Sequence, residues 1–292
     1  MNPFIQMRDW YSNLTPEERL RIDEMKSSVG SLLRGTPSSH GDSERDQLHA
    51  ALLAFQNSPE PRCLVRVGDT DIALLSGGAV LFDDRSVSKY LWHSGIDFRW
   101  FQFRHEFIEM AQSAPLYGIH TFQSWRYPAK ATEIILAMLG VPIPCPRAVV
   151  ISLSYYLLTS GALLNYAAGK KVLLVGEFAP RIAKAWTTKE FIEGHEHFGP
   201  VEKVKIVEAI ACLPRADKKD PEELSSIMEK IKKTDFDLAF ISAGGMGKLI
   251  AWRIWKDLRR TALDLGAGLN ALIGEHRDRG IFNEAKWPKV EW

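Results

Sequence analysis

Residues 169–177 read Gly-Lys-Lys-Val-Leu-Leu-Val-Gly-Glu, a short apolar run between two turn-forming glycines. An apolar run of this length is typical of a strand buried on both faces of a parallel sheet. We therefore predict a strand at Lys171 to Val175. Five further runs of similar type are Cys63 to Val67, Leu116 to Ile119, Val204 to Ala211, Asp237 to Ser242 and Thr261 to Leu265.

Stretches with helical spacing of apolar residues separate these runs. The predicted helices are Ala129 to Leu139, Leu153 to Ala168, Arg181 to Glu193, Pro221 to Lys232 and Gly247 to Arg260. This alternation predicts an α/β fold, a Rossmann-like and mostly parallel sheet with helices on both faces. The apolar segment 148–168 resembles a membrane span, but its polar residues and the weak point at Gly161 favour a strand followed by a buried helix.

The first 60 residues show signals of helices but not the alternation of strands and helices that follows. Thr15 and Pro16 are typical of a helix start, and a second helix is expected from about Ser43. We interpret residues 1–60 as an N-terminal helical extension and residues 61–292 as one Rossmann-like domain. Whether the extension packs on the core or on a partner stays open at this point.

Composition excludes several classes of protein. Lysine and arginine number 37 against 36 acidic residues, so the chain lacks the broad positive field that nucleic-acid binding needs. Cys63, Cys145 and Cys212 are far apart without metal-ligand spacing, which predicts buried thiols in a reducing compartment. The N-terminus shows no basic region or apolar run of a secretory signal, so we expect a cytoplasmic protein.

Glycines with polar or charged neighbours follow four of the predicted strands. These segments are residues 68–71 (Gly-Asp-Thr-Asp), 176–177 (Gly-Glu), 243–248 (Ala-Gly-Gly-Met-Gly-Lys) and 264–266 (Asp-Leu-Gly). Ligands of open parallel sheets bind outside the carboxyl ends of the strands, and glycine lets a phosphate approach main-chain amides there. We therefore predict a nucleotide-type ligand across this edge.

Asp69 and Asp71 are the strongest metal-site candidates in the chain. Two carboxylates separated by one residue can bind Mg²⁺ or Mn²⁺ together with substrate phosphates, and the metal would stabilise a departing diphosphate. Asp69 could instead be the N-cap of a helix that contains Ile72 and Leu74. The two interpretations do not exclude each other.

The segment Arg66-Val67-Gly68-Asp69-Thr70-Asp71 resembles the Arg-x-Gly-Asp-Gly-Glu signature of the GT-D fold glycosyltransferases, a family first catalogued as a domain of unknown function. Residues 169–177 resemble the central strand of that family, residues 236–247 its late strand with a glycine turn, and residues 262–266 its closing strand. These motifs follow the family order over roughly residues 63 to 275.

The resemblance implies a glycosyltransferase that uses a nucleotide-sugar donor, usually a UDP-sugar, with a divalent cation. It also implies a glycan or glycoprotein acceptor in polysaccharide biosynthesis at the cytoplasmic face. The donor site would include Arg66, Gly68, Asp69, Gly176, Gly244, Gly245, Lys248 and Asp264, and the metal would lie on Asp69 and Asp71. Two departures are the replacement of the family glutamate by Asp71, and residues 267–270 where many members carry a histidine.

Other residues have competing interpretations. As candidate catalytic groups we name Asp71, and Glu177 as the general base, although Glu177 could equally cap a helix or bind ribose. Arg181 and Lys248 could reach a diphosphate or lie in solvent, and Asp264 could form a buried salt bridge. In the region of residues 83–125 and just beyond, an acceptor sugar could stack on aromatic side chains that would otherwise fill the core: Trp92, Trp100, Trp125 and Tyr127.

The rival functions are a non-catalytic nucleotide-sugar-binding protein and, less favoured, a methyltransferase that uses S-adenosylmethionine. A methyltransferase or an NAD-dependent oxidoreductase would carry a glycine-rich turn after an early strand, and residues 65–69 do not offer one. We expect no transmembrane segment, while peripheral association with a membrane stays open. The sequence does not predict the oligomeric state.

Overall fold

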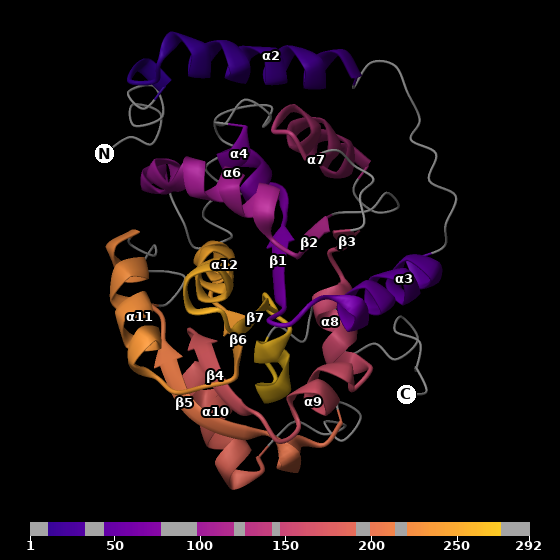
Figure 1. The fold of residues 1–292 in the computed structure, drawn as a ribbon, viewed down its shortest axis with the longest axis vertical. Helices are drawn as coiled ribbons and strands as arrows, with labels where there is room; N and C mark the ends of the chain where they lie inside the picture. Colours follow the sequence, from indigo (N-terminus) through magenta and orange to yellow (C-terminus); the bar gives the residue numbers. More distant parts are fainter. Residues whose placement is uncertain are drawn as a thin grey trace.

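The computed structural model describes residues 11–32, 44–76, 98–119, 126–141, 147–190, 199–213 and 221–275. Seven strands in these ranges form one parallel sheet in the order β3-β2-β1-β7-β6-β4-β5 (Figure 1). The strands are β1 (Cys63–Val67), β2 (Leu116–Ile119), β3 (Ala148–Val150), β4 (Lys171–Gly176), β5 (Lys205–Ala211), β6 (Leu238–Ser242) and β7 (Thr261–Asp264).

All six strands predicted from apolar runs are present. The observed first and last residues of each strand lie within one residue of the predicted ones. The expected strand at the start of segment 148–168 is β3. Because β1, β7 and β6 are neighbours, the loops that follow their carboxyl ends meet at one place on the edge of the sheet.

One face of the sheet is covered by five helices that share one apolar cluster with the strands. These helices are α4 (Asp69–Leu75), α6 (Arg104–Ser113), α7 (Arg126–Met138), α11 (Pro221–Lys233) and α12 (Gly247–Leu258). The opposite face is covered by a second cluster on α3 (Glu44–Asn57), α8 (Leu153–Thr159), α9 (Ala162–Ala167), α10 (Ala179–Thr188) and the 3-10 turn η6 (Leu269–Ile273). The prediction of helices on both faces is confirmed.

Four predicted helices differ from the structure by more than one residue. Helix α7 begins at Arg126, three residues before the predicted start, and α12 ends at Leu258, two residues before the predicted end. The stretch Leu153 to Ala168 is divided between α8 and α9, because Gly161 adopts a left-handed φ of 77° as the N-cap of α9. Helix α10 begins at Ala179, two residues before the predicted start, and ends at Thr188. Residues 191–198, which include the predicted end, lie outside the described ranges.

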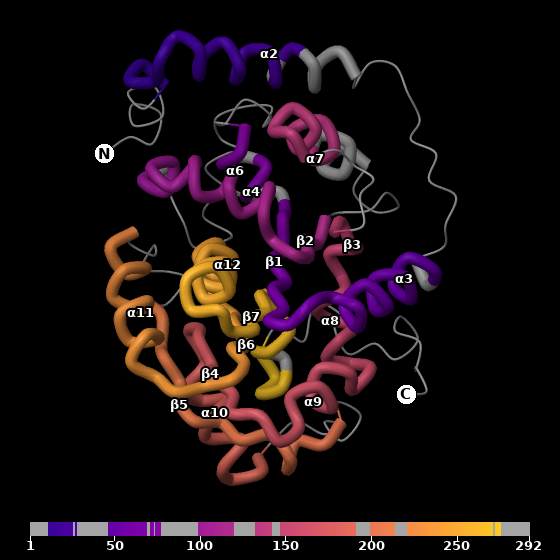
Figure 2. Tube along the Cα trace, viewed as in Figure 1, coloured from indigo at the N-terminus to yellow at the C-terminus, as the bar shows by residue number. Residues whose placement is uncertain are grey.

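The N-terminal helices pack on the rest of the molecule. Helix α3 lies against β3 and α8, with Leu48 and Phe55 in the second cluster. Helix α2 (Pro16–Leu32) lies across α7, and Met25 is buried in the first cluster. In Figure 1 and in the tube of Figure 2, α2 forms an outer layer beyond α4, α6 and α7. Both helices are therefore part of the packed structure, and none of the described helices is long and apolar enough to cross a membrane.

Gly176 on β4 lies very close to the main chain of the neighbouring strand β6. A Cβ at this position would lie 2.5 Å from the carbonyl oxygen of Ser242 on the neighbouring strand β6. We expect Gly176→Ala to lower the free energy of unfolding by about 3 kcal/mol, since two sheet strands must separate to admit it. Urea denaturation followed by tryptophan fluorescence measures this loss.

A matched control is Gly169→Ala, which lies just before the same strand. Gly169 has a φ of 75°, but a Cβ there would meet no atom within 4 Å. This variant should lose only about 1 kcal/mol of stability through backbone strain. A loss at Gly176 no larger than the loss at Gly169 would contradict the proposed crowding between β4 and β6.

Candidate active site at the carboxyl edge of the sheet

The loop after β1 is held by a capping interaction. Helix α4 begins at Asp69, Gly68 is its N-cap, and the main-chain N–H of Gly68 donates to Oδ2 of Asp71 at 2.7 Å. The interpretation of Asp69 as N-cap is therefore wrong by one residue, because Asp71 supplies the carboxylate that closes the first turn. The side chain of Asp69 lies outside the described part of the structure.

Asp71 is also paired with a lysine from the far end of the chain. The ammonium of Lys248 lies 2.7 Å from Oδ2 of Asp71, and the two side chains are 9% and 0% exposed. Burial raises the pKa of Asp71 to about 6, although the ammonium of Lys248 and the N–H of Gly68 act in the opposite direction. The solvent-exposed alternative for Lys248 is wrong.

The path of the chain after β6 brings Lys248 to this position. Strand β6 is followed by the 3-10 turn η5 (Gly244–Met246), in which Gly244 has a left-handed φ of 57°. Helix α12 then starts at Gly247, so that Lys248 lies in its first turn. Gly245 is buried within η5, and the expected contacts of Gly244 and Gly245 with a ligand stay predictions.

Asp264 links the ends of β7 and β1. Its Oδ1 accepts from the main-chain N–H of Gly266 at 3.1 Å, and the main chain of Arg66 also favours its charged form. Burial raises the pKa of Asp264, while the charges of Arg66 and Lys248 oppose this shift. The charges of both buried cations therefore act on Asp264, and its salt bridge and its contact with a ligand both stay predictions.

Arg66 is the second cation of this edge. Its guanidinium lies over the ring of Tyr155, 4.9 Å from the centroid. A Cβ added to Gly266 would lie 1.7 Å from Nη1 of Arg66, so this position leaves room for the guanidinium only because it is glycine. The Nε of Arg66 is buried and has no hydrogen-bond partner within the described residues. An anion beside Arg66 would satisfy this donor.

Arg66, Asp71, Lys248 and Asp264 together form a buried group that we name the sheet-edge cluster. It comes from the ends of three adjacent strands, and it holds two cations and two carboxylates. The sequence did not suggest the three side chains around it, Tyr155, Ser242 and Asn270. The hydroxyl of Ser242 lies 2.8 Å from Oδ1 of Asn270 and contacts the carbonyl of Gly266.

Glu177 and Arg181 lie one strand further along the edge, after β4. Arg181 is exposed and pairs with Glu275 at 2.7 Å, which agrees with the surface alternative for this residue. Gly176 packs closely on β6, so its lack of a side chain has a structural reason. The catalytic role of Glu177 and the binding role of Gly176 stay predictions.

The resemblance implies a divalent metal ion at the sheet-edge cluster. Oδ2 of Asp71 is already bound by Lys248 and Gly68, and Oδ1 is buried without a partner among the described residues. Oδ1 of Asp264 is bound by the main-chain amide of Gly266. Within the described ranges, no three acidic, histidine or cysteine side chains are grouped as metal ligands. Lys248 and Gly68 therefore already occupy Oδ2 of Asp71, while a metal on Oδ1 of Asp71 or on Asp69 stays a prediction.

The aromatic acceptor candidates fall mostly outside the described residues. Trp92, Trp125 and the side chain of Tyr127 are not described, while Trp100 is fully buried in the first apolar cluster. His105 is exposed and lies 3.3 Å from Glu18 on α2. Two of the thiols, Cys63 and Cys212, are buried and free as expected, and Cys145 lies outside the described ranges.

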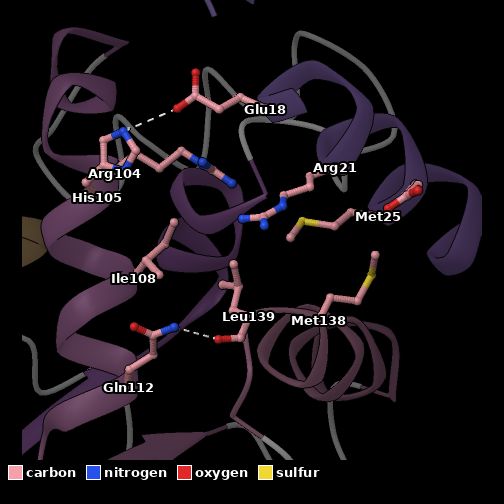
Figure 3. Close-up of a pocket in the computed structure, with 10 residues that line it drawn as sticks. Glu18, Arg21, Met25, Arg104, His105, Ile108, Gln112, Met138 and Leu139 are labelled. Carbon is pink, nitrogen blue, oxygen red and sulfur yellow. Dashed lines mark hydrogen bonds and ion pairs between the residues drawn. The ribbon is translucent and has the colours of Figure 1, made fainter. Parts of the chain in front are cut away.

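A separate cavity of about 460 Å³ lies between α2, α6 and α7. Figure 3 shows the guanidinium groups of Arg21 and Arg104 directed toward the same space, with Met25, Ile108 and Met138 further along the wall. Arg104 is largely buried, and its Nε donates to the carbonyl of Leu75 at the end of α4. This cavity shares no residue with the sheet-edge cluster.

Comparison with known proteins gives a family match. The sequence matches the family model described as a GT-D fold-like domain over residues 44–272, which includes α3 and all seven strands. A solved structure of the highly conserved domain of unknown function 1792, reported to have a distinct glycosyltransferase fold, is similar at 14% identity. The similarity covers 85% of this chain and 83% of that one, with a TM-score of 0.47. No curated protein matches the sequence significantly.

Proposed function

Since the chain belongs to the GT-D fold-like domain family, we propose that it is a glycosyltransferase with a nucleoside-diphosphate sugar as donor. The observation that supports the donor site is the pair of cations at the carboxyl edge. The Nε of Arg66 is buried without a partner in the described residues, and Lys248 pairs with Asp71, whose charge also acts on Arg66. A diphosphate at this edge would accept from both side chains.

The proposed reaction moves a sugar from a UDP-sugar to a hydroxyl of a glycan or glycoprotein. The bond between the sugar C1 and a diphosphate oxygen breaks, and its electron pair stays on the departing UDP. The acceptor oxygen forms the new bond to C1, and its proton passes to a base. We propose Glu177 as this base because it directly follows β4, one strand from the end of β6.

Glycines adjoin the charged groups of this edge. Gly68 is the N-cap of α4 and binds Asp71, and Gly266 leaves space for the Arg66 guanidinium. Gly244 turns the chain between β6 and α12. We propose that the donor diphosphate lies over these turns, and that the protein acts in the synthesis of a surface polysaccharide or glycoprotein.

A thermal-shift measurement tests the donor class. With UDP at a hundredfold excess over its dissociation constant, the melting temperature should rise by roughly 4 °C. S-adenosylmethionine and NAD at the same concentration should leave it unchanged, and GDP should produce a smaller rise than UDP. Stabilisation by S-adenosylmethionine or NAD alone would show that the function is of another class.

Turnover separates an enzyme from a protein that only binds. Released UDP can be measured after incubation of the protein with a panel of UDP-sugars and a pool of glycan acceptors. Formation of UDP that depends on the acceptor pool supports the glycosyltransferase. Stabilisation by UDP without any UDP release from the whole panel would favour the non-catalytic binding protein.

A further inference from the structure

The charges of the sheet-edge cluster already balance before any ligand arrives. Asp71 is paired with Lys248, while the carboxylate of Asp264 faces the charges of both Arg66 and Lys248. A nucleoside diphosphate adds negative charge to this neutral group. The charge needed to stabilise it must therefore come either from an additional cation or from the two cations that the chain supplies.

Lys248 occupies the place where a metal on Oδ2 of Asp71 would lie. Its ammonium is bound to Oδ2 of Asp71, the same oxygen that closes the first turn of α4. A metal at this oxygen would have to displace a buried, hydrogen-bonded cation, and the repulsion between the two positive charges would be strong in this buried environment. The arrangement therefore favours a single cation at Oδ2 of Asp71, and this cation is the ammonium of Lys248.

Lys248 keeps hydrogen-bonding capacity for a ligand. An ammonium has three donors, and the ion pair of Lys248 with Asp71 uses one of them. Lys248 also lies in the first turn of α12, where the main-chain amides point toward the carboxyl edge and add positive potential. Gly247 brings this turn close, since a Cβ there would lie 3.3 Å from Oδ1 of Asp264.

We propose that Lys248, oriented by Asp71, is the cation that stabilises the donor diphosphate, so that donor binding at this site requires no divalent metal. This inference rests on the proposed function. When the C1–oxygen bond breaks, the electron pair remains on the diphosphate, and Lys248 and Arg66 donate to its oxygens. Lys248 then contacts substrate, and Asp71 acts as a positioning residue.

Calorimetric titration of the full chain with UDP, in EDTA and again in MnCl₂, tests the proposal in the unmodified protein. The dissociation constant should differ by no more than about twofold between the two buffers. UDP binding that appears only with Mn²⁺ would overturn the proposal and leave the nucleotide-sugar donor intact. An absence of UDP binding in both buffers would overturn the proposed function itself, and this inference with it.

The variant Lys248→Met tests the role of the charge. In EDTA it should bind UDP at least about tenfold more weakly, because a charge-assisted hydrogen bond to phosphate is lost. Uridine, which lacks phosphates, should bind the variant and the wild type equally. An equal loss for uridine and UDP would show that Lys248 is only structural, and an unchanged UDP affinity would show that it does not contact the diphosphate.

Lys248→Arg is the matched control. It keeps a cation in the first turn of α12 and should retain most of the UDP affinity in EDTA. If Lys248→Met does not fold, the metal dependence of the wild type still decides the proposal. If Lys248→Arg and Lys248→Met weaken UDP binding equally, the positive charge at position 248 does not contribute to UDP binding.

Discussion

Replacement of Asp71 by alanine is expected to lower the free energy of unfolding by about 3–5 kcal/mol. The change leaves the Lys248 ammonium in a site that is 9% exposed, without the carboxylate that balances it. It also removes the acceptor for the N–H of Gly68 at the start of α4. Urea denaturation monitored by far-UV circular dichroism measures the loss.

A double-mutant cycle provides the control for this prediction. Lys248→Met alone leaves the buried carboxylate of Asp71 without its ion-pair partner, and the combination with Asp71→Ala removes both charges. The double variant should lose about 2 kcal/mol less than the sum of the single losses, since neither partner remains as an isolated buried charge. Strictly additive losses would contradict a direct interaction between the two residues.

The second large effect is expected on ligand binding at Arg66. Arg66→Met should weaken the affinity for UDP by about 10- to 100-fold, because the phosphate loses the charged hydrogen-bond donor of Arg66. The hydrogen-bond donors of the neighbouring groups remain. Arg66→Lys should restore part of the affinity without the planar contact over Tyr155. Calorimetric titration gives the dissociation constants, and the melting temperature of each variant checks that it is folded.

Arg181→Met is the matched control for Arg66. Both arginines lie close to a glycine at the end of a strand, but Arg181 is exposed and paired with Glu275. Its removal should change the UDP affinity by less than about twofold. Equal effects at the two positions, or no effect at Arg66, would place the diphosphate elsewhere.

The strands were predictable because their signal is local. Runs such as Lys171 to Val175 are apolar on both faces of the sheet, so the sequence alone marks them. The sequence also predicted that the polar strand ends would meet, since the carboxyl ends of parallel strands share one edge. The break at Gly161 had a local cause as well, because glycine adopts the left-handed conformation without a steric penalty.

The contacts within the site were not predictable, because their partners are distant in the chain. Lys248 follows a glycine turn at the start of a helix, a position where lysine is usually exposed, and its burial depends on Asp71 from the other half of the sheet. Tyr155 reaches Arg66 from α8, on the opposite side of the sheet from α4 and α12. The glycine at position 176 does not reveal from the sequence that it packs closely against Ser242 of β6.

Hydrogen–deuterium exchange of the protein, with and without saturating UDP, locates the donor site without any substitution. Protection is expected in peptides that contain Arg66 to Asp71, Ser242 to Lys248 and Asp264 to Gly268, the ends of three adjacent strands. Peptides of α2, α6 and α7, around the separate cavity, should exchange as before. Protection confined to those helices, with none at the strand ends, would contradict a donor site at the carboxyl edge of the sheet.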